Sequence, residues 1–140
     1  MVAGVLLGVE RERASKPAGI RTYMLVTEGA ALFMICAILL SDQLLRVGIV
    51  SDPGRIASTV VQGIGFIAAG VILTTGREIV GLTTAAGLWV ASAIGLLIGA
   101  GFFPVAVFAT IATIVALIVL HRVERQLTVA ESHSDTDSMP

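Results

Sequence analysis

The chain alternates long apolar runs with short charged segments. Most of its charged residues fall in four places, residues 10–21, 42–55, 77–78 and 121–137. A helix rises about 1.5 Å per residue, so it needs about 20 apolar residues to cross about 30 Å of hydrocarbon. Four apolar runs reach about this length, at residues 22–40, 55–75, 83–100 and 102–120. The pattern predicts four full transmembrane helices.

The segment from Met1 to Val9 is also apolar, but it is too short to span a membrane, because nine helical residues reach only about 14 Å. It lacks the charged start of a signal peptide, and Gly4 and Gly8 have a spacing typical of helix packing. We interpret this segment as the stub of a fifth helix, with a truncated or misplaced start. The expected fold class is all-α, a polytopic transmembrane bundle of four full spans plus this stub.

Composition agrees with a membrane protein and excludes several other classes. Hydrophobic residues make up 56% of the 140 residues and charged residues only 14%, with a mean hydropathy of +0.95. Soluble domains carry about 25% charged residues, so this chain needs a lipid bilayer around it. The net charge of −1 gives no basic surface for a nucleic acid, and the single Cys36 excludes a disulfide within the chain.

The basic residues predict the orientation, because Lys and Arg beside the spans are retained on the cytoplasmic side. One set of alternating loops holds most of them, namely Arg11, Arg13, Lys16, Arg21, Arg77, Arg122 and Arg125. The other set holds only Arg46 and Arg55. We therefore expect a multi-pass protein with a cytoplasmic C-terminus. Residues 1–125 form the expected transmembrane domain, and the polar residues 126–140 form a tail that is expected to be disordered.

A helix start is indicated where Asp52 can act as N-cap and Pro53 occupies the first helical position. Beyond it, Arg55, Ser58 or Thr59, and Gln62 recur on one face and form a polar stripe that enters the bilayer. Gln62 lies about 10 Å along the helix, where its amide needs a partner other than lipid. The stripe fits either a hydrogen bond between helices or a polar path.

Small residues predict where helices pack closely. One run repeats a small residue at every fourth position, with Thr83, Gly87, Ala91, Gly95 and Gly99. A second run holds Gly63, Gly65 and Gly70, for which we expect a similar packing role. The segment from Gly101 to Pro104 predicts a tight turn between the last two spans.

Glu28 is the one carboxylate inside a predicted span. An ionisable group within the membrane suggests a functional role, and it should face the bundle. The alternative is a protonated carboxyl group that hydrogen-bonds to another helix, with Gln62 or Arg55 as the candidate partner. A Mg²⁺ pathway usually presents several oxygen ligands at one depth, so a single Glu28 would need an oligomer to gather several copies.

Nothing in the sequence indicates an enzyme, a cofactor or a metal site. The motifs of zinc metalloproteases, serine hydrolases and P-loop nucleoside triphosphatases are absent. His121 and His133 lie at the end of the last predicted helix and in the tail. The loop from Thr75 to Glu78, followed by Thr83 and Thr84, could cradle an anion at a helix start. A loop with a helix cap explains the same residues.

Five blocks of polar and small residues occur in order along the chain. They are Gly4-x-x-x-Gly8-x-Glu10-Arg11, Ala18-Gly19-Ile20-Arg21-Thr22, Asp52-Pro53-Gly54-Arg55-Ile56-Ala57, Gly63-Ile64-Gly65-Phe66-Ile67-Ala68-Ala69-Gly70 and Gly81-Leu82-Thr83-Thr84-Ala85-Ala86. Together these blocks resemble the MgtC/SapB family. The resemblance implies a bacterial inner-membrane protein linked to low-magnesium growth, stress adaptation and, in pathogens, virulence. Some members are described as transport-associated, and others as regulators that contact membrane ATPases, including ATP synthase.

The resemblance carries over a set of polar positions as functional candidates, namely Glu10, Arg11, Arg21, Asp52, Arg55, Gln62, Thr83 and Thr84. Glu28 stands outside the family pattern, and we find no counterpart of the soluble C-terminal domain of longer members after Arg125.

Two functions follow as expectations. The first is a non-catalytic regulator of magnesium homeostasis that acts through helix contacts with itself or with a membrane ATPase. The second is a small oligomeric channel or transporter for Mg²⁺ or another ion, with Glu28 or the Arg55–Gln62 stripe as its polar path. A dry, packed centre would favour regulation, and a continuous wet cavity would favour transport.

Overall fold

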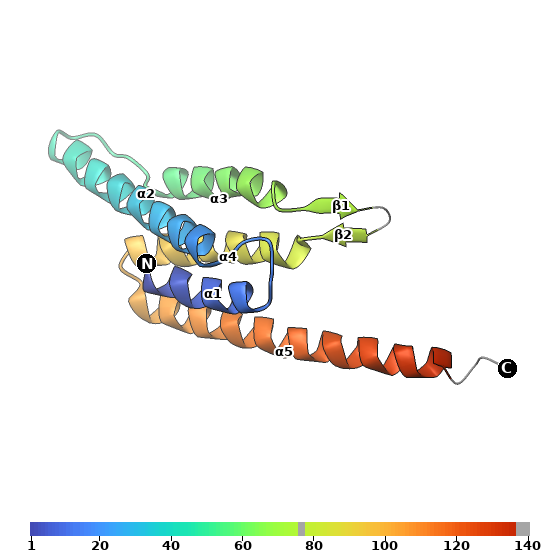
Figure 1. Cartoon of the computed structure of the whole chain (residues 1–140). Coiled ribbons are helices and arrows are strands. Elements are labelled where there is room, and N and C mark those ends of the chain that lie inside the picture. The colour runs from blue at the N-terminus through green and yellow to red at the C-terminus, as the bar shows by residue number, and fades with distance from the viewer. Residues whose placement is uncertain (76–77, 137–140) are drawn as a thin grey trace.

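The computed structural model describes residues 1–75 and 78–136. Five helices and one short hairpin make up this part of the chain (Figure 1). In order they are α1 (Val2–Arg13), α2 (Ile20–Arg46), α3 (Gly54–Ala69), β1 (Leu73–Thr75), β2 (Glu78–Val80), α4 (Leu82–Gly99) and α5 (Phe103–Thr136). The expected helical bundle is confirmed.

The expectation of four full spans is confirmed only in part. Three helical segments are long and apolar enough to cross a membrane, namely Ile20–Arg46, Leu82–Gly99 and Phe103–Arg122. The fourth, α3, has 16 residues and rises only about 24 Å. It is shorter than expected because the chain leaves the helix at Gly70 and enters the hairpin instead of continuing to residue 75.

The antiparallel hairpin lies where a loop was expected. Leu73 pairs with Val80, and Thr75 pairs with Glu78. Gly81 then leads the chain into α4 with φ +96°, a backbone conformation that residues other than glycine rarely adopt. A Cβ at Gly81 would also overlap the carbonyl oxygen of Val71, so the close approach of the two hairpin ends depends on this glycine.

Two further boundaries follow from where glycine and proline occur. The expected turn between α4 and α5 is present, with Gly101 at φ +83°. In contrast, α5 continues to Thr136 through most of the segment predicted as a disordered tail. No glycine or proline occurs between Pro104 and Pro140 to end the helix, and residues 137–140 lie outside the described part of the chain.

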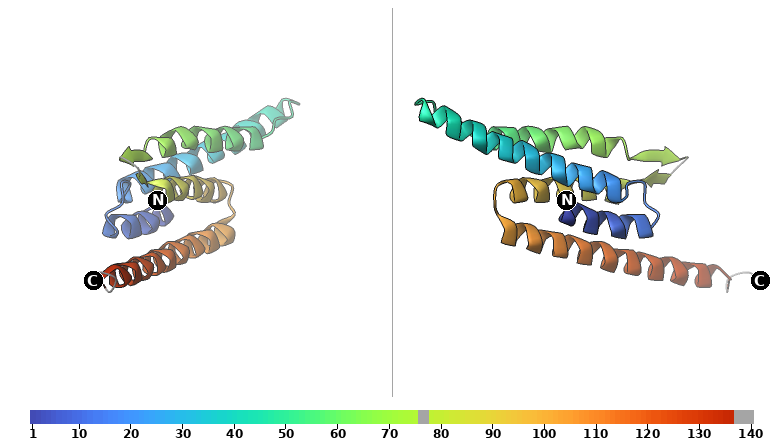
Figure 2. Two further views of the ribbon diagram at one scale, coloured as in Figure 1. Left: turned by 90° about the vertical axis from the view of Figure 1, so that its right-hand side faces the viewer. Right: turned by 60° about the vertical axis from the view of Figure 1, so that its left-hand side comes forward.

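Successive helices run in opposite directions (Figures 1 and 2). One end of the bundle holds the N-terminus, the α2–α3 connection and the α4–α5 turn. The other end holds the α1–α2 loop, the hairpin and the C-terminal end of α5. We call this second end the basic end, because Arg13, Lys16 and Arg21 belong to it. Its assignment to the cytoplasm stays a prediction.

The core lies around α4, which contacts all four other helices. Side chains from four helices fill it, including Leu7, Tyr23, Leu88, Ile94 and Ala106, each at most 3% exposed.

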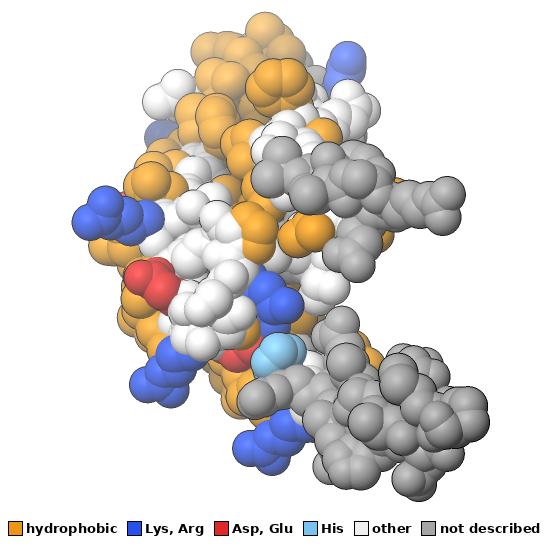
Figure 3. Space-filling model, turned by 45° about the vertical axis from the view of Figure 1, so that its right-hand side comes forward, with side chains coloured by type: hydrophobic (Ala, Val, Ile, Leu, Met, Phe, Trp, Pro, Cys, Tyr) orange, Lys and Arg blue, Asp and Glu red, His pale blue; other side chains and the backbone are white. Residues whose placement is uncertain are grey.

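The outside of the bundle is apolar. Phe33 on α2 is 59% exposed and Phe108 on α5 is 73% exposed, and Figure 3 shows part of this hydrophobic surface. An apolar surface of this extent fits contact with lipid chains.

Candidate functional site

A buried ion pair lies near the end of α1. Arg11 is only 2% exposed, and its Nη2 donates to Glu10 Oε1 at 2.7 Å. Its Nε donates to the other oxygen of the same carboxylate, so the contact is bidentate. A buried guanidinium needs such a partner, because desolvation of an unpaired charge costs several kcal/mol.

Tyr23 of α2 is also fully buried. Its hydroxyl group donates to the carbonyl oxygen of Thr84 at 3.2 Å. Thr84 lies in the first turn of α4 and is 1% exposed. We name these four residues, Glu10, Arg11, Tyr23 and Thr84, the polar cluster.

Glycines on α1 and α4 allow both helices to pack closely against the first half of α2. A Cβ at Gly4 would lie 2.6 Å from the carbonyl oxygen of Tyr23, and one at Gly8 would overlap Ile20. On α4, a Cβ at Gly87 would overlap the Tyr23 hydroxyl, and one at Gly95 would overlap the carbonyl oxygen of Thr27. The polar cluster therefore exists only because the helix backbones approach this closely.

The rest of the small-residue repeat on α4 also faces α2. Ala91 is fully buried, and a Cβ at Gly99 would overlap the carbonyl oxygen of Ala31. Thr83 differs from the expectation, because it is exposed while its neighbour Thr84 points into the core. The repeat therefore faces α2 from Gly87 onward and not from Thr83.

Glu12 holds the start of α2. Its Oε2 accepts a hydrogen bond from the backbone N–H of Ile20 at 2.9 Å, and it lies against Gly19. Arg21 is exposed beside it and lines a surface hollow with Ser15 and Lys16. The sequence analysis did not single out Glu12 or Tyr23, because their partners lie eight and 61 residues away and no local pattern connects them.

Glu28 lies half-buried on α2 and makes no hydrogen bond or ion pair within the described residues. The suggested contact with Arg55 or Gln62 is not formed. Both of these residues are exposed on α3, whereas the buried Ile64 and Ala68 mark the face of α3 that packs on the bundle. The expected pairing is wrong because α3 turns its polar stripe away from α2.

The start of α3 differs by one residue from the expectation. Pro53 takes the N-cap position, and Asp52 Oδ1 accepts from the backbone N–H of Gly54 at 2.8 Å. Asp52 thus still satisfies a free amide of the first turn.

The packing role expected for the glycines of α3 is not supported within the chain. A Cβ at Gly63 or Gly65 would meet nothing within 4 Å, and Gly70 approaches only carbonyl groups of its own helix. These glycines lie on the exposed side of α3.

The described residues contain no group of three His, Cys, Asp or Glu side chains that could hold a metal ion. The anion-cradling loop suggested by the sequence includes Gly76 and Arg77, which lie outside the described residues. The chemistry available in the described part is thus that of a buried ion pair and a tyrosine hydroxyl, joined by closely packed helices.

The comparison with protein families gives the same result as the sequence blocks. The model of the MgtC family matches residues 1–126, nearly the whole chain. The chain belongs to the MgtC family. Within this MgtC-family chain, the blocks containing Glu10, Arg11 and Thr84 meet in the polar cluster, whereas the blocks containing Arg55 and Gly63 to Gly65 lie along α3.

Several curated proteins are similar to this MgtC-family chain. "Putative magnesium transporter YhiD" of Escherichia coli K12 is 43% identical over 122 residues, which cover 86% of this chain and 57% of that protein. "Protein MgtC" of Salmonella typhimurium LT2 is 41% identical, with coverage of 91% and 52%. "Uncharacterized protein slr0014" of Synechocystis is also 41% identical, with coverage of 95% and 54%.

The chain spans about half the length of the curated relatives it matches. No solved structure matches it.

Proposed function

We propose that this chain is a bacterial inner-membrane protein of magnesium homeostasis and low-magnesium or stress adaptation, which acts as a non-catalytic regulator through contacts with another membrane protein. The observation that carries the proposal is the packed centre of the bundle. Leu7, Tyr23, Leu88 and Ile94 are at most 1% exposed there, and glycines bring the backbones of α1, α2 and α4 into contact. Close packing of this kind favours helix contacts over a wide path for a hydrated ion.

The ligand chemistry supports the same proposal. Mg²⁺ prefers six oxygen ligands and gives up its water reluctantly. The one acidic side chain well inside a span, Glu28, belongs to no group of three His, Cys, Asp or Glu side chains among the described residues. The polar groups of the core are instead satisfied by one another, as Arg11 is by Glu10 and Tyr23 is by Thr84.

A membrane ATPase such as ATP synthase is the proposed partner. The test is ATP-driven proton pumping in inverted membrane vesicles that hold the synthase, measured with a pH-sensitive dye. Added chain should lower the initial pumping rate, and Arg11→Leu, compared at an equal amount of folded protein, should lose this effect because it breaks the buried ion pair. Arg13→Leu alters an exposed arginine on the same helix and serves as the matched control. Unchanged pumping with folded protein would reject this partner.

Transport remains the second candidate function. It is favoured by the relative named "Putative magnesium transporter YhiD" and by the presence of Glu28 inside α2. Transport would require several chains to bring their Glu28 side chains around a common path. Glu28→Gln should then preserve insertion into the membrane but abolish flux, whereas a regulator that acts by helix contacts should tolerate it.

A further inference from the structure

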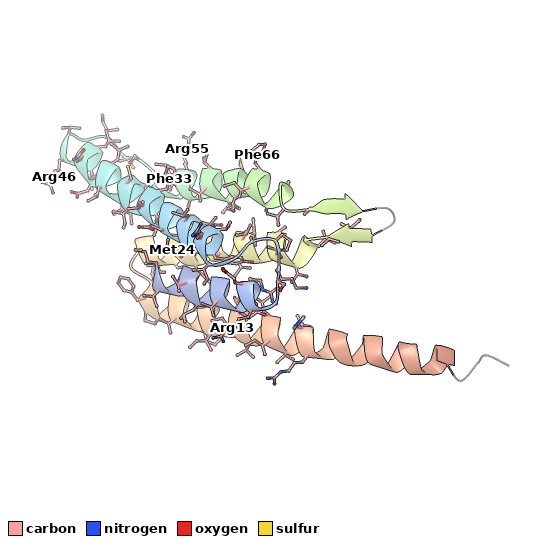
Figure 4. The ribbon with its side chains drawn as sticks, viewed as in Figure 1. Arg13, Met24, Phe33, Arg46, Arg55 and Phe66 are labelled. Carbon is pink, nitrogen blue, oxygen red and sulfur yellow. The ribbon has the colours of Figure 1, made fainter. Side chains whose placement is uncertain are left out.

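The outward face of α3 carries polar side chains whose hydrogen-bonding groups lipid chains cannot satisfy. Arg55, Thr59, Gln62 and Phe66 follow one another at three- and four-residue spacing and are all exposed, Phe66 by 87%. In Figure 4, Arg55 and Phe66 point away from α4. Ile64 and Ala68 lie on the opposite, buried side. We call these four exposed residues the α3 face.

Gln62 is the side chain of the α3 face that lies well inside the helix and lacks a hydrogen-bond partner among the described residues. The hydroxyl group of Thr59 donates to the Arg55 carbonyl oxygen at 2.9 Å, and the neighbouring Ser58 donates to the same oxygen at 2.8 Å. Gln62 makes no side-chain hydrogen bond within the described residues, and it lies about 12 Å along a helix of 16 residues, near its middle. An amide at that depth is costly to leave in contact with hydrocarbon.

A second copy of this chain satisfies that amide best. Copies of one membrane protein share the same orientation, so a two-fold axis along the membrane normal brings residues of equal depth together. A glutamine amide is both donor and acceptor, and two of them form reciprocal hydrogen bonds across such an axis. An unrelated partner would need a matching polar group at the same depth.

Two further features of α3 fit this arrangement. Gly63 lies beside Gln62, and a Cβ there would meet nothing within 4 Å, so a second helix can approach closely. Asp52 and Arg55 are both exposed at the start of α3, and Arg55 forms no ion pair in the described part of the chain. In a parallel pair, Asp52 of each copy can face Arg55 of the other, so the charges are self-complementary.

From these observations we propose that the chain forms a parallel homodimer through the α3 face, with the two Gln62 side chains hydrogen-bonded across the two-fold axis. The dimer does not depend on the proposed regulatory role. It accounts for Gly63 and Gly65, where an added Cβ would meet no atom of the described residues within 4 Å.

Disulfide trapping in native membranes tests the interface. Cys36 is first replaced by Ala, because this native thiol is exposed. In that background Phe66→Cys should give an oxidant-dependent dimer, whereas Phe108→Cys, at a similarly exposed position on α5, should stay monomeric. Dimer from both variants indicates random collision and overturns the proposal. Monomer from both variants, in protein that elutes as a folded species, also overturns it.

The role of Gln62 is tested without cysteines, by the association of dye-labelled protein in liposomes at several protein-to-lipid ratios. Gln62→Leu should lower the association constant about ten-fold, and Gln62→Asn should restore part of it, because it retains the amide. Thr59→Val removes only a hydroxyl group that is already satisfied within its helix, and it should leave association unchanged. Equal association of the wild type and Gln62→Leu would reject the amide contact.

Discussion

The hydroxyl group of Tyr23 donates a hydrogen bond to the carbonyl oxygen of Thr84, 61 residues further along the chain. The hydroxyl occupies the place that a side chain at Gly87 would fill. One contact thus joins α2 to the start of α4. The Tyr23–Thr84 hydrogen bond therefore depends on the close approach of α2 and α4 at Gly87.

Removal of the tyrosine hydroxyl should weaken the fold moderately. Tyr23→Phe loses the hydrogen bond to Thr84 and leaves a small gap, so the free energy of unfolding should fall by about 1 kcal/mol. The measurement is SDS-induced unfolding in mixed micelles, followed by circular dichroism. No change in the transition midpoint would indicate that this contact contributes nothing to stability.

Substitution by alanine should destabilise the protein far more at the glycines that contact α2 than at the exposed glycines of α3. Gly87→Ala introduces a Cβ that overlaps the Tyr23 hydroxyl, and overpacking of this kind costs about 1–3 kcal/mol. Gly65→Ala places the same methyl group where nothing lies within 4 Å, so it should be neutral or slightly stabilising. The two variants are compared in the same unfolding assay. Equal losses from both would contradict the packing described for α4.

The buried ion pair should be more sensitive to single than to double substitution. Arg11→Leu leaves the Glu10 carboxylate without its partner, and breaking a buried pair costs about 3–5 kcal/mol. Glu10→Gln combined with Arg11→Leu removes both charges and should recover most of that loss. Membrane abundance and the unfolding midpoint measure both effects. A double variant as unstable as Arg11→Leu would show that lost packing, and not the unpaired charge, causes the damage.

The orientation prediction concerns the two ends of the bundle. In a Cys36→Ala background, Val50→Cys lies in the α2–α3 connection and Ser15→Cys lies at the basic end, and both positions are exposed. A membrane-impermeant maleimide should label Val50→Cys in intact spheroplasts and Ser15→Cys only after permeabilisation. The reverse pattern would place the basic end and the C-terminus outside.

Local patterns in the sequence were sufficient for some features of the fold. Apolar length revealed α2, α4 and α5, and Gly101 revealed the turn between the last two. The hairpin was missed because residues 71–75 continue the apolar run of α3 without a break that a pattern could detect. The length of α5 could not be predicted from composition, because a polar segment without glycine or proline can either continue a helix or leave it.

The candidate site could be predicted only in part. Glu10, Arg11 and Thr84 were singled out because they are polar residues within the family-like blocks, but their meeting with Tyr23 depends on how α1, α2 and α4 rotate against one another. Helix rotation is fixed by contacts between distant glycines and backbone atoms, which one-dimensional spacing does not encode. Helix rotation also explains why Arg55 and Gln62 were considered as partners of Glu28, although both side chains are exposed on α3.

The central claim is that the protein acts by contact and does not conduct ions, and Mg²⁺ flux tests it most directly. Purified protein is reconstituted into liposomes that hold a Mg²⁺-sensitive dye, and an imposed Mg²⁺ gradient is compared with empty liposomes and with the Glu28→Gln variant. A protein that acts by contact should give the flux of empty liposomes, and so should its Glu28→Gln variant. A protein-dependent flux that Glu28→Gln abolishes would instead establish a transporter.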